Sequence, residues 1–128
     1  MKTFKKTYTL NAGAEDIYAS LTNPVTIEIW SGYPAEMSTK PGSLFSLWEG
    51  DIEGMIIEAE KNKKLVQEWF FGEQKERSIA TIILVRDFGQ TQVTVEHTNI
   101  PDSDFKNIAT GWSEYIMSAI ENFLNPNF

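Results

Sequence analysis

The sequence contains no cysteine and only one histidine, His97, among its 128 residues. Without cysteine there is no disulfide and no thiolate ligand, and one histidine is too few for a recognisable zinc site. No glycine-rich phosphate loop and no nucleophile-elbow motif occurs in the chain. We therefore expect no metal and no cofactor.

Basic residues are scarce, because 11 lysines and arginines face 18 acidic residues and the net charge is −7. This balance argues against a nucleic-acid partner, which requires a basic surface, and against an anionic membrane. No apolar run approaches the ~18 residues of a membrane span, and no apolar segment follows the basic N-terminus as in a signal peptide. We expect a cytoplasmic protein.

Against these absences, the C-terminal stretch 103–124 stands out for its helical periodicity. Apolar residues recur there at steps of three and four, which is the spacing of one helix face. These residues are Phe105, Ile108, Ala109, Trp112, Tyr115, Ile116, Ala119, Ile120 and Phe123. The pattern predicts a helix about 30 Å long, and such a helix needs an apolar surface to lie on. The space between the two is either core or a ligand cavity.

The rest of the chain is typical of short strands with two brief helices. Alternation and turn residues predict strands near 3–10, 36–39, 44–49, 55–60, 65–71, 78–86 and 91–98. The first short helix lies between Gly13 and Asn23, and a second helix or turn covers 25–30. Strands joined by short turns are antiparallel neighbours. We predict a single α+β domain over residues 1–128, with the helices on one face of the sheet.

Strand alternation assigns two polar side chains, Gln67 and His97, to the inner face of this sheet. A buried polar group needs a partner, so the two bind each other, bind cavity water or orient a ligand. The predicted cavity residues are Trp30, Phe45, Leu47, Gln67, Trp69, Phe71, Ile82, Leu84, Val95, His97, Ile108, Trp112, Tyr115 and Ile116. The alternative is that the aromatic members are simply core.

Two further hypotheses concern single residues. A Glu58–His97 pair would allow acid–base chemistry if the two side chains were close. Trp48 and Phe70 fall on the outer faces of their predicted strands, where each is either part of a partner surface or an isolated exposed apolar residue.

Motifs along residues 8–124 resemble the activator of heat-shock-protein-90 ATPase homologue family, a branch of the START-like helix-grip superfamily. The order and spacing of the motifs carry the likeness. They include Glu15-Asp16-Ile17-Tyr18, Trp30 before Tyr33-Pro34-Ala35, Pro41-Gly42-Ser43-Leu44-Phe45, Asp51-Ile52-Glu53-Gly54, Leu65-Val66-Gln67-Glu68-Trp69, Val95-Glu96-His97 before Ile100-Pro101, and Gly111-Trp112 with Tyr115.

The resemblance implies a curved antiparallel sheet wrapped around the C-terminal helix. Superfamily members commonly hold apolar small molecules between helix and sheet, and in the eukaryotic activators this domain binds the chaperone's ATPase region. The first hypothesis for function is therefore binding of a small apolar or aromatic ligand. The second is interaction with a heat-shock-protein-90-type chaperone, and the third is a cavity hydrolase or cyclase with His97 as base. The resemblance supplies no catalytic residue.

Overall fold

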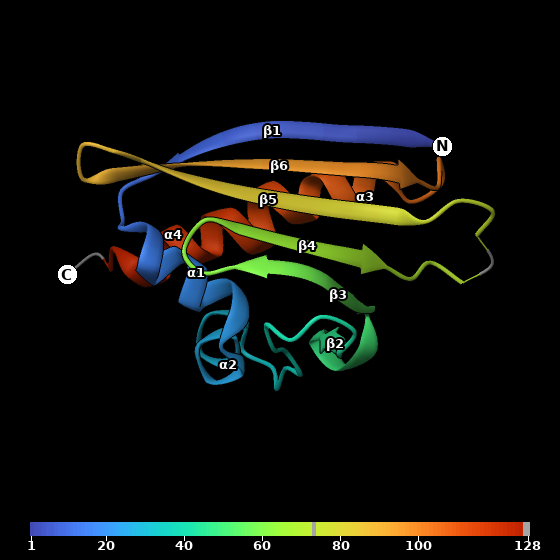
Figure 1. Ribbon diagram of the computed structural model, residues 1–128, viewed down its shortest axis with the longest axis horizontal. Helices are drawn as coiled ribbons and strands as arrows, with labels where there is room; N and C mark the ends of the chain where they lie inside the picture. Colours follow the sequence, from blue (N-terminus) through green and yellow to red (C-terminus); the bar gives the residue numbers. More distant parts are fainter. Residues whose placement is uncertain (73, 127–128) are drawn as a thin grey trace.

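The computed structural model describes residues 1–72 and 74–126 and contains one antiparallel sheet of six strands in the order β1-β6-β5-β4-β3-β2 (Figure 1). The strands are β1 (Lys2–Leu10), β2 (Leu44–Leu47), β3 (Ile52–Glu60), β4 (Lys64–Trp69), β5 (Ser78–Asp87) and β6 (Gln90–Ile100). The chain starts at one edge of the sheet, crosses through the short helices to the other edge, and returns strand by strand until β6 pairs with β1. The predicted α+β helix-grip fold is confirmed.

Two short helices, α1 (Ala14–Thr22) and α2 (Pro24–Ser31), link the two edges of the sheet. They meet at Asn23, whose side chain accepts hydrogen bonds from the backbone N–H groups of Val25 and Thr26. This is a standard N-cap, with Pro24 at the first helical position, where its missing N–H costs nothing. Gly32 then ends α2 with a left-handed φ of 83°.

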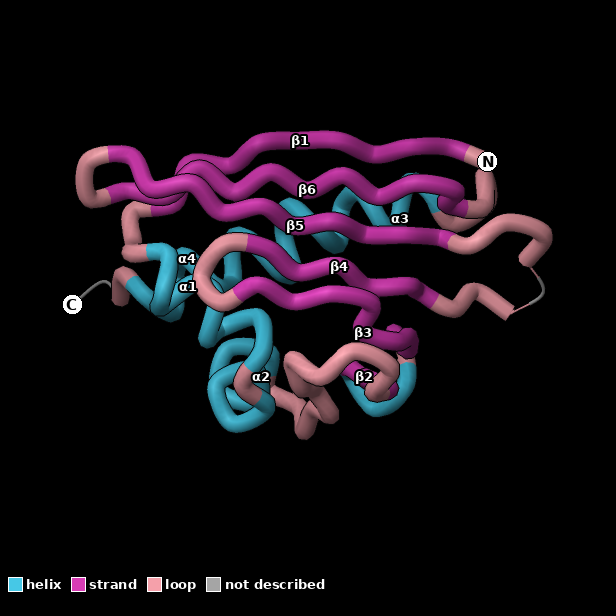
Figure 2. Tube along the Cα trace, in the orientation of Figure 1, coloured by secondary structure: helices cyan, strands magenta, loops and turns pink. Residues whose placement is uncertain are grey.

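The predicted strand at 36–39 is wrong. The structure has only a single bridge there, between Glu36 and Ser46, and Figure 2 shows the segment between α2 and β2 as loop. The hydroxyl of Ser38 accepts a hydrogen bond from the backbone N–H of Lys40 and lies 2.7 Å from that of Ser43. Local side-chain bonds of this kind hold the backbone in a turn instead of a ladder.

The C-terminal helix runs across one face of the sheet as three segments: α3 (Phe105–Thr110), η2 (Gly111–Met117) and α4 (Ser118–Leu124) (Figure 1). The middle segment η2 is π-helical, and the N–H of Ser118 bonds to the carbonyl of Ser113, five residues earlier. The predicted C-terminal helix is confirmed, with Trp112, Ile116 and Ile120 buried, but the π-helical segment changes part of its inner face. The wider turn buries Met117 beside Ile116, while Tyr115 is 62% exposed.

The space between the helix and the sheet is packed core. Buried side chains from both layers fill it, among them Phe45, Ile56, Leu65, Ile82, Val93, Val95, Trp112, Ile116, Met117 and Ile120. The remaining void at the centre of this layer is about 20 Å³, which holds about one water molecule. The predicted internal ligand cavity is thus closed in this structure.

None of the helices within residues 1–72 and 74–126 is long and apolar enough to span a bilayer.

Candidate functional site

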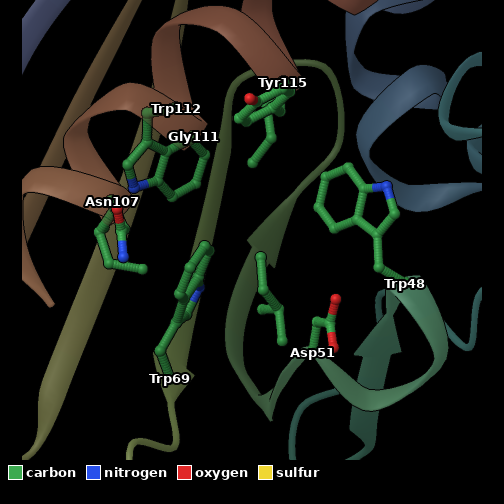
Figure 3. Close-up of a pocket in the computed structure, with 10 residues that line it drawn as sticks. Trp48, Asp51, Trp69, Asn107, Gly111, Trp112 and Tyr115 are labelled. Carbon is green, nitrogen blue, oxygen red and sulfur yellow. The ribbon is translucent and has the colours of Figure 1, made fainter.

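A groove of about 470 Å³ opens beside the first half of the C-terminal helix (Figure 3). Its lining residues are Trp48, Asp51, Ile52, Trp69, Asn107, Ile108, Gly111, Trp112, Tyr115 and Ile116. They come from the helix, from the end of β4, and from the turn η1 (Trp48–Gly50) with the start of β3. The groove therefore lies where the curved end of the sheet meets the helix, and it opens to solvent.

Trp48 forms one wall of the groove because of an unusual backbone turn. Trp48 and Glu49 both have left-handed φ values, 48° and 56°. Such a conformation costs non-glycine residues about 1–3 kcal/mol each, and it often occurs at functional sites. The turn packs the Trp48 indole edge-on against Trp30, with ring centroids 6.0 Å apart. The prediction that Trp48 lies on the outer face is wrong, since the side chain is half-buried and faces the groove.

Behind the groove, Trp69 and Trp112 stack at a centroid distance of 5.1 Å and continue into a buried cluster with His97. The Trp112 indole N–H donates to Nδ1 of His97 at 3.0 Å. Because an indole nitrogen only donates, Nδ1 carries no proton and Nε2–H donates to the Ser78 hydroxyl at 2.9 Å. The Ser78 hydroxyl in turn donates to the Thr98 carbonyl at 3.0 Å. Both ring nitrogens of His97 and the hydroxyl of Ser78 are therefore hydrogen-bonded.

Gln67 is satisfied in a separate pair of contacts. Its side-chain oxygen accepts the Trp69 indole N–H at 3.0 Å, and its amide nitrogen lies 3.8 Å from the Met37 sulfur. Gln67 and His97 occupy one row of the sheet with Ala80 between them. The hypothesis that Gln67 and His97 bind each other is therefore wrong.

The two catalytic hypotheses for His97 are contradicted by its surroundings. Glu58 is exposed and pairs with Lys64 at 3.2 Å, so it does not pair with His97. His97 has no exposed surface and both ring nitrogens are occupied. Burial also lowers the pKa of His97 to about 4. A base in this position has no nitrogen left for a substrate.

The predicted cavity residues divide into three groups. Five line the groove: Trp69, Ile108, Trp112, Tyr115 and Ile116. Trp30, Leu47, Gln67 and Ile82 surround the small void, together with several groove residues. The rest pack in the core or beside it: Phe45, Phe71, Leu84, Val95 and His97. Whether any of them binds a ligand stays a prediction.

Sequence reasoning missed five residues of the groove: Trp48, Asp51, Ile52, Asn107 and Gly111. The sequence places Asp51 and Ile52 in a hairpin motif and predicts Asp51 to be a solvated surface charge. The signal available was the Trp48-Glu49-Gly50-Asp51 run directly after a strand, which is typical of a turn. The left-handed conformation that directs Trp48 inward is not readable from that run. Phe70, by contrast, is exposed as predicted.

Burial of His97 predicts a specific acid dependence of stability. The folded-state pKa of about 4 lies below the ordinary 6.5, so the unfolded chain binds the proton first as the pH falls. The free energy of unfolding should decrease from about pH 6.5 downward and lose about 3 kcal/mol by pH 4. Urea denaturation across this interval measures the slope. A His97→Gln variant should lack this slope, and parallel curves for the two proteins would contradict the assignment.

Comparison with known proteins identifies the family. A family model described as "Activator of Hsp90 ATPase homolog 1-like protein" matches residues 11–125. An uncharacterised protein, C1711.08, from Schizosaccharomyces pombe is 27% identical over 116 residues, which cover 91% of this chain and 33% of that protein. The activator of 90 kDa heat shock protein ATPase homolog 1 from Homo sapiens is 25% identical over 121 residues, covering 93% and 35%. This chain thus spans about a third of the length of these relatives.

A solved structure agrees over nearly the whole chain. The crystal structure of PFC0360w, titled an HSP90 activator from Plasmodium falciparum, is 26% identical with a TM-score of 0.88 and covers 97% of this chain and 96% of that one. The strand order and the packed C-terminal helix support the same fold, and the family model matches residues 11–125 of the chain. The chain belongs to the activator of Hsp90 ATPase homolog 1-like family.

Proposed function

We propose that this chain is a co-chaperone-type domain that binds a chaperone of the Hsp90 class. The observation that carries the proposal is the end-to-end likeness to a protein titled an HSP90 activator, which extends over 97% of this chain. The filled interior supports the same conclusion, because a core with a void of about 20 Å³ leaves recognition to the surface.

The exposed face of α2 supports such a surface. Val25 and Ile29 are one helical turn apart and are 70% and 63% exposed, and Tyr33 follows them at 47%. Exposed apolar residues that gather on one helix face are typical of protein contact sites. The net charge of −7 complements a basic partner surface, and such complementarity speeds association and improves specificity.

The test is retention of the host's own Hsp90 homologue on the immobilised chain, together with the ATPase rate of that chaperone. We expect retention and a changed ATPase rate with the native chain. A Val25→Ser, Ile29→Ser double variant should bind at least about tenfold more weakly, since two apolar contacts of about 1 kcal/mol each are removed.

The matched control is Phe88→Ser, which removes a fully exposed aromatic side chain from the tip of the β5–β6 hairpin and should leave binding unchanged. No retention and no change in ATPase rate with the native chain would reject the co-chaperone proposal. Equal loss in the control would reject α2 as the contact.

The groove favours a second candidate function, the binding of a small apolar or aromatic molecule. Its volume of about 470 Å³ lies in the range of small-molecule sites, and its walls are mainly aromatic and aliphatic. The predicted ligand position thereby moves from the closed interior to the open end of the helix–sheet layer. Small aromatic compounds that shift NMR resonances of groove residues and raise the thermal midpoint would support this function. An absence of both effects would exclude it.

A further inference from the structure

We propose that the groove selects organic cations, meaning a flat apolar body that carries a positive charge. This inference rests on the second proposed function, binding of a small molecule in the groove, and adds the chemical class of the ligand. Two independent properties of the lining carry it: the aromatic rings and the charge.

The aromatic rings form opposing walls. Figure 3 shows Trp48 on one side of the groove, Trp69 and Trp112 on the other, and Tyr115 at the end between them. The face of an aromatic ring carries partial negative charge and attracts a cation within about 6 Å of its centroid. Trp is the strongest of these partners. The accessible rings are those of Trp48, which is half-buried, and Tyr115, which is 62% exposed, while Trp69 and Trp112 are 3% and 2% exposed and form the floor behind them. The rings of Trp48 and Tyr115 therefore offer more to a cation than to an uncharged molecule of the same shape.

The charge of the lining also favours a cationic ligand. Among the described residues that line the groove, Asp51 is the one carboxylate and there is no lysine or arginine. Asp51 is exposed and forms no salt bridge with any residue of the described ranges 1–72 and 74–126. A cation in the groove would supply the positive charge that this wall lacks.

The lysines of this chain that do contact aromatic rings lie elsewhere. Lys2 sits over Phe105 at 5.3 Å and Lys6 over Tyr8 at 5.1 Å, and neither lysine lines the groove. The described part of the chain therefore provides no side-chain cation that already occupies the Trp48 wall, and an external ligand would not have to displace one.

Two isosteric probes test the inference: phenyltrimethylammonium and tert-butylbenzene, which differ only by a charged nitrogen in place of carbon. Binding is followed on ¹⁵N-labelled protein through the Trp48 indole and the Gly111 amide. The Gly89 amide, which lies in the turn between β5 and β6 and outside the groove lining, serves as an internal reference. We expect the cation to bind at least about fivefold more tightly than the hydrocarbon.

Three variants separate the two causes. Asp51→Asn should weaken cation binding about fivefold while leaving the hydrocarbon unaffected. Trp48→Leu, which keeps an apolar side chain but removes the ring, should also weaken the cation selectively. The control Glu53→Gln removes the same charge from a residue outside the lining and should change cation binding less than twofold.

The outcomes distinguish failure of the cation inference from failure of the small-molecule function. Equal affinity for the two probes would overturn the cation inference and leave the small-molecule function standing. Shifts confined to residues outside the groove, or no shifts with either probe, would overturn both. Equal losses in Asp51→Asn and Glu53→Gln would overturn the role of Asp51, since net charge alone would then explain the effect. Unchanged resonances in the remainder of the spectrum would show that the variants are folded.

Discussion

A Gly54→Ala variant should lose at least about 3 kcal/mol of unfolding free energy, which is a large part of the stability of a domain this size. Gly54 lies near the start of β3, between Phe45 on β2 and Trp69 on β4. A Cβ atom there would be 2.0 Å from the Glu68 carbonyl oxygen and 2.6 Å from the Phe45 ring. The oxygen belongs to the backbone of β4 and cannot move away without breaking the ladder.

The same substitution at Gly111 is the matched control. A Cβ at Gly111 meets no atom within 4 Å, and the backbone there is right-handed helical. Alanine should therefore stabilise the protein by about 0.5–1 kcal/mol, because it restricts the unfolded chain. Urea denaturation of both variants measures the contrast. If Gly54→Ala does not fold, its collapsed NMR spectrum beside a native-like Gly111→Ala spectrum gives the same answer, whereas equal stabilities would contradict the packing around β3.

Trp112→Ala should lose about 4 kcal/mol of unfolding free energy. The Trp112 side chain is only 2% exposed and stacks on Trp69, and removal of a buried tryptophan leaves a large cavity. The change also leaves Nδ1 of His97 without its donor, at a site with no access to solvent. An unpaired buried acceptor adds about 1–3 kcal/mol to the cost.

A Trp112→Phe variant separates packing from hydrogen bonding. Phenylalanine keeps most of the ring but lacks the N–H, so we expect a smaller loss of about 2 kcal/mol. Phe88→Ala removes a fully exposed aromatic side chain and should change stability by less than about 0.5 kcal/mol. Urea denaturation at neutral pH ranks the three variants. A loss below about 1 kcal/mol for Trp112→Ala would show that the indole is not packed as the structure has it.

Much of the architecture followed from local patterns. Alternation in the β5 and β6 segments correctly placed Ile82, Leu84, Val95 and His97 on the inner face. Gly13 and Asn23-Pro24 correctly marked the ends of α1, since capping and the proline constraint act within a few residues. The motifs from Glu15 to Tyr115 correctly identified the family.

The errors arose where side-chain hydrogen bonds, either local or between strands, override the simple alternation pattern. The stretch 36–39 has strand-like residues, but hydrogen bonds among Ser38, Lys40 and Ser43 hold it as a turn. The hypothesis that Gln67 and His97 bind each other is wrong because the register of β4, β5 and β6 inserts Ala80 between them. Gln67 accepts the indole N–H of Trp69, and His97 accepts that of Trp112. These pairings depend on proximity in the folded structure.

The order of the long strands and helices and the inner faces of the long strands follow from the amino-acid sequence, because both depend on periodicities and caps that operate over a few residues. The family follows from the order and spacing of the motifs. The tertiary structure alone decided that the space under the helix is filled and that the opening lies beside Trp48 and Asp51. It did so because the π-helical turn changes which helix residues point inward and because the left-handed turn at Trp48 directs an indole off the strand. Both features are stabilised by packing between segments far apart in the chain.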